Sequence, residues 1–403
     1  MRLPSPYDRL LIPIYVPSFL MAISNQAMML LLPLYALHVL DSPAFAALVV
    51  GCRGLGILIF DVPAGMLVGR FGDKAVLLGG LFTHALVMFA LAIVSEQWLL
   101  PLLAIPLGGG MAAWFLGRQS YITDTCVAAE RGRAIAVTAG VNRSGAFIGP
   151  VVGGLAAEVF GYPAAFAAGA ILTLVAAVIV VGFTHNIRPK QAPRKTVLAV
   201  IGRILKSNRR QFATAGFAAL TIQLMRATQQ LLVPLFGTLA GLEVATIGFI
   251  YSMCAALDMS LFYPVGVVMD RWGRKWTGVP SMLVFVLGLT LLPFAQGFYS
   301  LLAAGLVLAL ANGLSTGIVM IVGMDMAPPD QRGQFLVVWR LIGDLGVVSG
   351  PLLAGVLANV ATLAAASFAA AALGLFGAGT FQFLVPETLH YSHRRDAKSC
   401  PSG

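Results

Sequence analysis

Long apolar stretches recur along almost the whole chain and constrain its fold more than any other feature. A helix needs about 20 apolar residues to cross the hydrocarbon core of a bilayer. Twelve such stretches cover residues 11–37, 43–68, 75–95, 98–122, 134–158, 162–184, 211–237, 245–268, 276–296, 299–324, 334–358 and 362–385. They lack the alternation of a membrane barrel, and open sheet edges would stay unsatisfied in lipid. The sequence therefore predicts an all-α polytopic membrane protein with 12 transmembrane helices.

The composition supports this prediction and argues against other classes. Charged residues make up 10% of the chain, against roughly 25% in soluble domains. The net charge of +10 does not indicate nucleic acid, because the basic residues lie in short connections between apolar stretches. The four cysteines include no CxxC pair, so we expect no disulfide framework, metal site or cofactor. The first apolar stretch is too long for a cleavable signal peptide and is interpreted as a span.

Basic residues predict the orientation of the chain. Of the 26 lysines and arginines, 21 lie in the N-terminus, the loops after even-numbered spans and the C-terminal tail, and the other five lie within spans. The opposite loops carry only acidic residues, namely Asp41, Glu96, Glu158 and Glu243. Since cytoplasmic loops are enriched in basic residues, we expect a multi-pass protein of the plasma (inner) membrane with both termini cytoplasmic.

The predicted organisation has four parts. They are an N-terminal six-helix half (1–184), a basic linker (185–210), a C-terminal six-helix half (211–385) and a cytoplasmic tail (386–403). The linker has eight basic residues and no acidic one, and its apolar residues from Val197 to Leu205 recur at helical spacing. This pattern favours an amphipathic helix on the anionic lipids of the inner leaflet. The alternative is a solvated linker that serves as a topology signal.

An internal repeat relates the two halves at a constant offset of 201 residues. Pro33 matches Pro234, and Pro63 matches Pro264. The register holds without a gap across five spans. It predicts two pseudo-symmetric halves in the same orientation, an arrangement that lets transporters rock around a site between the halves.

A charged turn follows the second and the eighth span. The later copy consists of Gly266, Asp270, Arg271, Gly273, Arg274 and Lys275. The earlier copy keeps Gly65, Arg70, Gly72 and Lys74, with Gly69 where the aspartate is expected. With these motifs the chain resembles the major facilitator superfamily over nearly its whole length. The resemblance implies a gating role for the motif, whose aspartate helps to lock the cytoplasmic side. A topology signal on a tight turn is the alternative.

Small residues and a proline form a second motif in the fifth span. They are Gly145, Gly149, Pro150, Gly153 and Gly154. The motif resembles one found in the 12-helix drug/metabolite:proton antiporter branch of the superfamily, which points to export through a bent helix. A similar set recurs in the eleventh span, at Gly346, Gly350 and Pro351, so plain helix packing is the alternative. Pro106 stands where exporters of this branch often have an arginine.

Eight ionisable residues lie within predicted spans, where each costs at least ~2.5 kcal/mol at mid-helix. Six of them are proton-coupling candidates: Asp258, Asp61, Asp344, Arg143, Arg340 and Arg53. Arg143 and Asp258 each lie twelve residues from a cytoplasmic loop, so we expect them to pair. Asp344 can bridge Arg340 at i,i+4. These pairs act either as structural contacts that specify how the halves meet or as proton-coupling switches.

The remaining intramembrane arginines are Arg118, expected in a cytoplasmic cluster with Asp124 and Arg131, and Arg226. In the superfamily, spans one, four, seven and ten line the central cavity. The resemblance therefore implies the cavity residues Asn25, Gln26, Trp114, Gln223, Arg226, Gln229, Gln230, Asn312, Ser315 and Thr316. Core packing is the alternative for Trp114, and an arginine reaching toward the membrane interface is the alternative for Arg226.

The predicted function is secondary active transport of a small organic solute. Five intramembrane arginines against three aspartates disfavour an organic cation and favour an amphipathic neutral, zwitterionic or anionic substrate. We expect proton-coupled efflux by a monomer. An importer or exchanger of an organic anion, such as a carboxylate or phosphorylated metabolite, is the alternative. No HExxH, GxSxG or Walker pattern indicates an enzyme, and His38, His84 and His185 are expected near loops or span ends.

Overall fold

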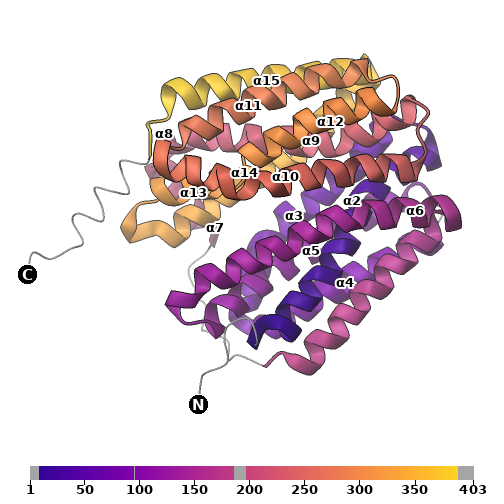
Figure 1. Ribbon diagram of the computed structural model, residues 1–403. Coiled ribbons are helices and arrows are strands. Elements are labelled where there is room, and N and C mark those ends of the chain that lie inside the picture. Colours follow the sequence, from indigo (N-terminus) through magenta and orange to yellow (C-terminus); the bar gives the residue numbers. More distant parts are fainter. Residues whose placement is uncertain (1–8, 95, 186–196, 389–403) are drawn as a thin grey trace, which may run out of the picture. The chain divides into compact units, whose positions relative to one another are not determined.

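The computed structural model describes residues 9–94, 96–185 and 197–388, and this part of the chain is helical with no β-strand (Figure 1). The first helices are η1 (Leu11–Tyr15), α2 (Val16–Leu40), α3 (Pro43–Phe71), α4 (Asp73–Ile93), α5 (Leu99–Thr125) and α6 (Ala128–Phe183). Then come α7 (Val197–Ser207), α8 (Arg209–Gln211), η2 (Phe212–Gly216), α9 (Phe217–Leu239), α10 (Val244–Trp272), α11 (Lys275–Leu291) and η3 (Leu292–Phe294). The last are α12 (Phe298–Leu314), α13 (Ile318–Met326), η4 (Pro329–Gln331), α14 (Arg332–Val360) and α15 (Leu363–Leu384). The predicted all-α fold is confirmed.

The helices differ from the predicted stretches at two places, where one helix joins two stretches and where one stretch is divided into two helices. α6 joins the fifth and sixth stretches, and Gly161 at φ 83° and ψ 162° breaks its helical path between them. The tenth stretch is divided into α12 and α13, because Gly317 takes the left-handed conformation at φ 77°. In the described residues, ten helices are long and apolar enough to cross a membrane, with α6 counted once and α9 not among them. The number of 12 spans stays a prediction.

Helix starts follow from local capping. The Ser42 side chain accepts a hydrogen bond from the Phe45 amide at 3.3 Å, and Pro43 occupies the first position of α3. Thr362 caps α15 in the same way, through the Ala365 amide at 3.0 Å. Ser and Thr at the cap and proline at the first helical position are the favoured residues there. Polar residues between apolar stretches therefore define where these two spans begin.

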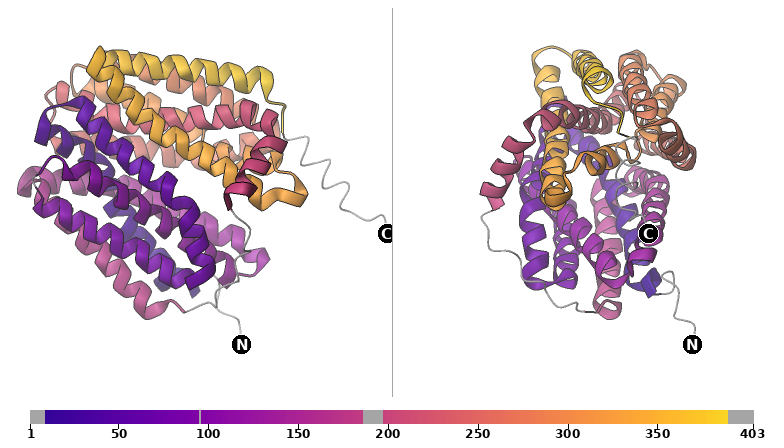
Figure 2. Two further views of the ribbon diagram at one scale, coloured as in Figure 1. Left: turned by 180° about the vertical axis from the view of Figure 1, so that it is seen from behind. Right: turned by 90° about the vertical axis from the view of Figure 1, so that its left-hand side faces the viewer.

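The chain divides into two compact units. Unit 1 comprises Met1–Pro193 and Pro234–Ala255, and unit 2 comprises Arg194–Val233 and Ala256–Gly403. In unit 1, α2 packs along α6, and α5 packs along both α3 and α4. The Glu158 carboxylate of α6 also accepts a hydrogen bond from the Ala245 amide at 2.8 Å, at the start of α10. In unit 2, α11 runs beside α12 and α15 (Figures 1 and 2).

The glycines of the fifth and eleventh spans lie at tight helix crossings inside each unit. A Cβ atom on Gly149 of α6 would lie 2.7 Å from the Ile23 carbonyl oxygen of α2. A Cβ atom on Gly350 of α14 would lie 2.6 Å from the Leu224 carbonyl oxygen of α9. Both distances are shorter than van der Waals contact, so only glycine fits. Close helix packing is therefore one established role of this motif, and its link to export stays a prediction.

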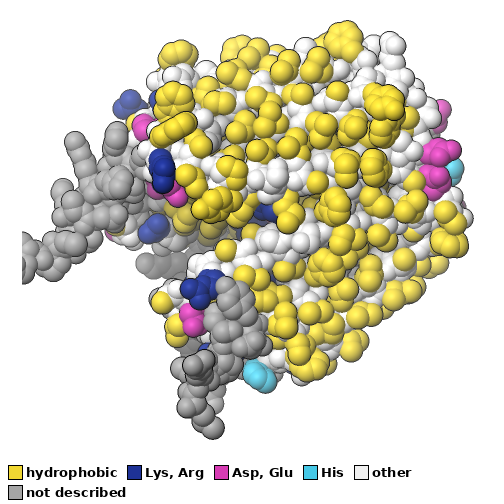
Figure 3. Space-filling model, in the orientation of Figure 1, with side chains coloured by type: hydrophobic (Ala, Val, Ile, Leu, Met, Phe, Trp, Pro, Cys, Tyr) yellow, Lys and Arg dark blue, Asp and Glu magenta, His cyan; other side chains and the backbone are white. Residues whose placement is uncertain are grey.

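Hydrophobic side chains cover the sides of the helices, as expected for a surface in contact with lipid. On the visible face they spread over the lengths of the helices, and charged side chains gather toward helix ends (Figure 3). Leu86 in unit 1 and Phe376 in unit 2 are 72% and 71% exposed. The basic linker helix also forms, as α7, and it packs against α14 with Ile204 buried. Its contact with lipid stays a prediction.

Candidate transport site and charged-turn network

A polar cluster in unit 2 surrounds the break between α12 and α13. Arg226 of α9 donates through Nη2 to the Ser315 carbonyl oxygen at 3.0 Å and to the Ser315 hydroxyl at 2.6 Å. Its Nη1 donates to Gln223 Oε1 at 3.2 Å. Irregular backbone at membrane depth is tolerated where it lines a cavity or is buried in protein. The arginine and the broken helix therefore form one structural element.

Further predicted residues join this cluster. Asn312 donates through Nδ2 to Gln229 Oε1 at 2.8 Å. Thr316, in the break itself, donates to Asp258 Oδ1 at 3.4 Å. The structure thus brings together a predicted proton-coupling carboxylate and several predicted cavity residues. Gln230 is half-buried on the same helix as Arg226.

Unit 1 holds a second buried polar group, built on Arg53 of α3. Its Nη2 donates to Asn25 Oδ1 at 3.2 Å, and Asn25 donates to the Met29 sulfur at 3.6 Å. Arg53 is 8% exposed. Gln26, the neighbour of Asn25, is half-buried where α2 meets Gly149. Arg53 therefore has a neutral amide partner rather than a carboxylate among its described hydrogen bonds.

The structure corrects the expectation for His84. It lies within α4, far from both helix ends, and its side chain is fully buried. Neither ring nitrogen has a hydrogen-bond partner among the described residues. The signal was available in the sequence, since residue 84 lies near the middle of the stretch 75–95.

Arg118 also differs from the expected cytoplasmic cluster. Its Nη1 donates to Ser18 at 3.4 Å and to Asn142 at 3.1 Å, and the side chain is 4% exposed. The guanidinium carbon lies 5.5 Å from the centroid of the Trp114 ring. Trp114 is 1% exposed and belongs to a hydrophobic cluster with residues of α2, α4 and α6. Trp114 was predicted to line the cavity, with core packing as the alternative, and its buried position is that of a core residue.

The other intramembrane carboxylates are buried as predicted for interior charges. Asp61 is 7% exposed and Asp344 is 9% exposed. The i,i+4 contact is present, with Arg340 Nε 4.0 Å from Asp344 Oδ2. Arg143 belongs to unit 1 and Asp258 to unit 2, so their pairing stays a prediction.

The charged turn between α10 and α11 is the centre of a polar network at one end of unit 2. Arg274 Nε lies 3.1 Å from Asp325 Oδ2, and its Nη1 lies 3.7 Å from Asp270 Oδ1. The Glu387 carboxylate accepts from the Arg274 and Lys275 amides at 2.9 and 3.1 Å. It thereby supplies negative charge at the N-terminus of α11, where a helix favours it. The sequence motif did not reveal that the acceptor comes from the segment after α15.

Gly273 allows this close approach of Glu387. Its φ of 114° is unfavourable for any residue with a side chain, and a Cβ atom there would lie 2.7 Å from the Glu387 carboxylate. Thr388 continues the segment and donates to Asp325 at 2.9 Å. Of the remaining motif residues, Gly266 is half-buried with open space around the position of a Cβ atom, and Arg271 is exposed at the end of α10.

The lysine of each motif copy caps a later helix. Lys74 Nζ donates to the Val181 and Thr184 carbonyl oxygens at 2.7 and 2.9 Å, at the end of α6. Lys275 Nζ donates to the Gln382 carbonyl oxygen at 2.6 Å, at the end of α15. Residues 181 and 382 are related by the same offset as the two lysines. A cation at the C-terminal end of a helix is favourable, so both copies join equivalent helix ends.

Repeated bundles of apolar helices with arginines and aspartates buried among them define an integral, multi-pass membrane transporter. The model of the Major Facilitator Superfamily matches residues 14–266 and 215–399. The chain belongs to this superfamily, which confirms the resemblance found in its motifs.

Comparison with individual proteins is consistent with this assignment. The chain is 26% identical to multidrug resistance protein MdtH of Yersinia enterocolitica over 280 residues, which cover 65% of each chain. It is 26% identical to MdtH of Cronobacter sakazakii over 261 residues, which cover 60% of each chain. The matched part thus spans less than two thirds of the length of these relatives.

Solved structures share the fold. A bacterial homologue of the human lysosomal transporter Spinster gives a TM-score of 0.76 at 13% identity, with 96% of this chain and 99% of that chain covered. The nucleoside transporter NupG gives a TM-score of 0.77 at 15% identity, with 94% and 100% covered. These likenesses concern the fold alone.

Proposed function

We propose that the protein exports an amphipathic neutral, zwitterionic or anionic solute in exchange for protons, by alternating access. The observation that carries this proposal is the cluster in unit 2, where Arg226 is held by the helix break and Asp258 bonds to the same break. A guanidinium and a titratable carboxylate thus bond to the same broken segment of backbone. The similarity to proteins named multidrug resistance protein MdtH supports efflux.

The cluster suits a substrate with an acidic or hydrogen-bonding group. Arg226 bonds to Gln223 and Ser315, which are neutral groups, and its guanidinium attracts an anionic group of a solute at the helix break. Amides such as Gln229 and Asn312 can donate and accept, which accommodates neutral and zwitterionic compounds. An organic cation would meet the positive guanidinium and is disfavoured.

Asp258 connects this site to protons. A charged carboxylate is costly within a membrane, so uptake of a proton by Asp258 favours its neutral form there. The neutral acid can donate a hydrogen bond instead of only accepting one from Thr316, which changes its bond to the helix break. We propose that this change accompanies substrate release. In the other state of the cycle, we propose that the charged carboxylate pairs with Arg143 instead of Thr316.

Transport by purified protein in liposomes tests the coupling. Candidate substrates come from a thermal-shift panel of amphipathic carboxylates, zwitterions and cations. An imposed pH gradient will drive flux in the wild type, and Asp258→Asn will abolish this flux while counterflow of substrate continues. Ser260→Ala on the exposed side of the same helix is the matched control. Full pH-driven flux in Asp258→Asn and in Arg143→Ala would disprove the coupling.

An importer or exchanger of organic anions is a second candidate function. Two intramembrane arginines favour it: Arg53 is buried and bonds to the amide of Asn25, and Arg226 is half-buried and bonds to the amide of Gln223. Counterflow separates the two candidates, because an exchanger moves a labelled carboxylate or phosphate ester only against a second anion, with or without a pH gradient.

We further infer twelve crossings of the inner membrane, both termini in the cytoplasm, and a monomer as the transporting form. The kink at Gly161 and the length of α9 support the first point. Fluorescent and phosphatase reporters fused to the C-terminus test the orientation. A phosphatase-active fusion would place this terminus outside.

A further inference from the structure

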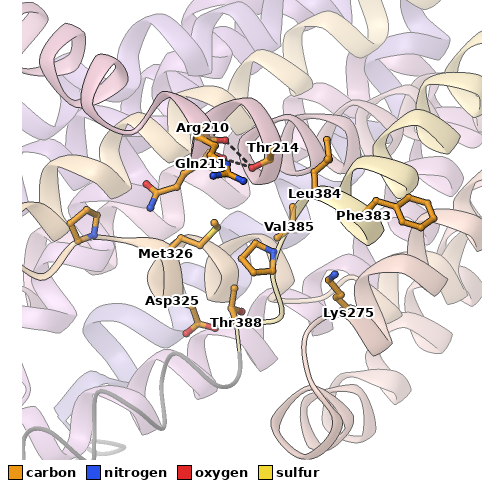
Figure 4. A pocket seen from close by; sticks show the side chains of 12 residues that line it. Arg210, Gln211, Thr214, Lys275, Asp325, Met326, Phe383, Leu384, Val385 and Thr388 are labelled. Atoms are coloured by element: carbon orange, nitrogen blue, oxygen red, sulfur yellow. Dashed lines mark hydrogen bonds between the residues drawn. The ribbon is translucent and has the colours of Figure 1, made fainter.

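A cavity of about 750 Å³ lies at the end of unit 2 that carries the charged turn. It is bounded by the starts of η2 and α11 and by the ends of α13 and α15 (Figure 4). Polar groups that line it are Arg210, Gln211, Thr214, Lys275, Asp325 and Thr388. None of these residues belongs to the proposed transport cluster, so the cavity requires a separate explanation.

The charges around the cavity favour an anionic ligand. Arg210 is exposed, and Lys275 uses one of its three N–H groups on Gln382. The one carboxylate among the lining residues, Asp325, is compensated by Arg274 and Thr388. The Glu387 carboxylate bonds to the Lys275 amide, but neither the Arg210 nor the Lys275 side chain forms an ion pair among the described residues. Together these two cations suit a phosphate group.

Gln211 adds a second and independent indication of a ligand. Its side-chain oxygen Oε1 is buried and has no hydrogen-bond partner among the described residues. Such an acceptor costs free energy unless a donor reaches it. This oxygen has almost no accessible surface, whereas the residue as a whole is half-buried, so the side chain must rotate toward the cavity to meet a donor. After that rotation, a ligand with both a phosphate and a hydroxyl group would satisfy the cations and this acceptor together.

The rim of the cavity is apolar and lies at the expected membrane surface. Phe383 and Leu384, in the last turn of α15, are 84% and 60% exposed. Trp272 and Trp276 flank the charged turn, are 65% and 64% exposed, and pack edge to face. Exposed tryptophans are typical of the membrane–water interface. Acyl chains could thus leave the cavity along an apolar edge.

We propose that this cavity binds the headgroup of phosphatidylglycerol or a similar hydroxyl-bearing anionic phospholipid of the inner leaflet. The phosphate contacts Arg210 and Lys275, and a headgroup hydroxyl donates to Gln211. Exposed Arg203 and Lys206 on α7 attract such lipids to the same end of the unit. The proposal rests on the cytoplasmic position of this end, but not on proton coupling or on any substrate.

The chain itself offers a competing occupant, the sequence after residue 388. That segment carries Arg394, Arg395 and Lys398 against a single acidic residue, Asp396. Its charge has the same sign as that of Arg210 and Lys275. A lipid phosphate is the better match on electrostatic grounds.

Short-chain lipids added to the detergent-solubilised full-length protein test the proposal. Dioctanoyl phosphatidylglycerol will raise the apparent unfolding temperature, and native mass spectrometry will show one retained molecule. In Arg210→Gln the lipid concentration for half-maximal stabilisation will rise about fivefold, as expected for one basic residue near a lipid phosphate. Arg209→Gln removes the same charge outside the cavity and will leave this concentration unchanged. Gln211→Leu will weaken binding of phosphatidylglycerol more than that of phosphatidic acid, which lacks the hydroxyls.

Several outcomes would overturn the site. If Arg210→Gln and Arg209→Gln raise the lipid concentration for half-maximal stabilisation equally, the lipid responds to general surface charge and not to this cavity. Equal stabilisation by dioctanoyl phosphatidylcholine or phosphatidylethanolamine would exclude recognition of an anionic lipid, and equal stabilisation by inorganic phosphate would assign a free-anion site. If the lipid binds only after removal of residues 389–403, the segment and not a lipid occupies the cavity.

Discussion

The two motif lysines allow a quantitative test of the repeat. Each donates to carbonyl oxygens at the end of a later helix, Lys74 to two of them and Lys275 to one. Replacement by methionine keeps most of the aliphatic chain and removes the donor. The freed carbonyls lose a charge-assisted partner at a helix C-terminus, where such a partner is favourable.

Because Lys74 makes two of these hydrogen bonds and Lys275 makes one, we expect the two substitutions to destabilise the protein unequally. Hydrogen bonds to charged groups contribute ~1.5–3 kcal/mol, and because water reaches these helix ends we expect about 1 kcal/mol per bond. Lys74→Met should therefore cost about 2 kcal/mol and Lys275→Met about 1 kcal/mol. For a unit of this size, 1 kcal/mol corresponds to about 2–4 °C in unfolding temperature. Lys74→Met will thus lower the midpoint by about 4–8 °C, roughly twice the effect of Lys275→Met.

Thermal unfolding of both variants in the same detergent provides the assay. Arg70→Gln, four residues before Lys74 and stacked over Phe71 at 5.2 Å, is the control for loss of a cation from the same turn. It will change the midpoint by less than either lysine variant. If both lysine variants unfold like the wild type, or if Lys275→Met is the more damaging, the capping role is refuted.

Three further predictions concern helix packing, the network around the charged turn of unit 2, and a buried thiol. Gly350→Ala will strongly reduce the folded yield, because its Cβ atom would meet the Leu224 carbonyl oxygen, whereas Gly140→Ala, with open space around it, will be tolerated in a size-exclusion assay. Glu387→Gln will lower the unfolding temperature by removing negative charge from the N-terminus of α11, a contribution of about 0.3–1 kcal/mol, and an unchanged midpoint at low salt would contradict this. Burial raises the pKa of the Cys126 thiol, which is 6% exposed; its alkylation will therefore be slow at neutral pH and will accelerate as the pH rises through that pKa. Labelling at the rate of a free thiol at neutral pH would show that the site is open.

Much of the helical architecture could be predicted, because a bilayer imposes its thickness on the sequence. Helix ends beyond the apolar stretches could not, since α3 and α10 continue through charged residues to Phe71 and Trp272. The apolar composition of a stretch indicates which residues lie within the bilayer, but it does not indicate where the helix ends. The break at Gly317 was missed for a related reason, because a single left-handed glycine leaves the hydropathy of its stretch unchanged.

The candidate site was predicted in its residue types but not in its partners. The spacing of Arg340 and Asp344 was sufficient to expect their contact, since both lie on one helix. Arg118 was placed wrongly because its partners, Ser18 and Asn142, come from other helices and are neutral. The offset likewise related Lys74 to Lys275, but it could not show which carbonyl oxygens they reach. Contacts between helices depend on crossing geometry, which no single stretch encodes.

The two charged turns share a geometry but differ in their ionic balance. Arg274 is flanked by Asp270 and Asp325, whereas the equivalent positions of the first half hold Asp73, Gly69 and Asp124. The second turn thus has an arginine between two carboxylates, whereas the first turn has Asp73 at the position of that arginine and Gly69 at the position of Asp270. A chimaera of two second halves would add a cation to one end of the molecule, and a chimaera of two first halves would remove one. The repeat is thus kept in the bonds of Lys74 and Lys275 to helix ends, but not in the charges of the two turns, so one half cannot replace the other without changing the charge of that turn.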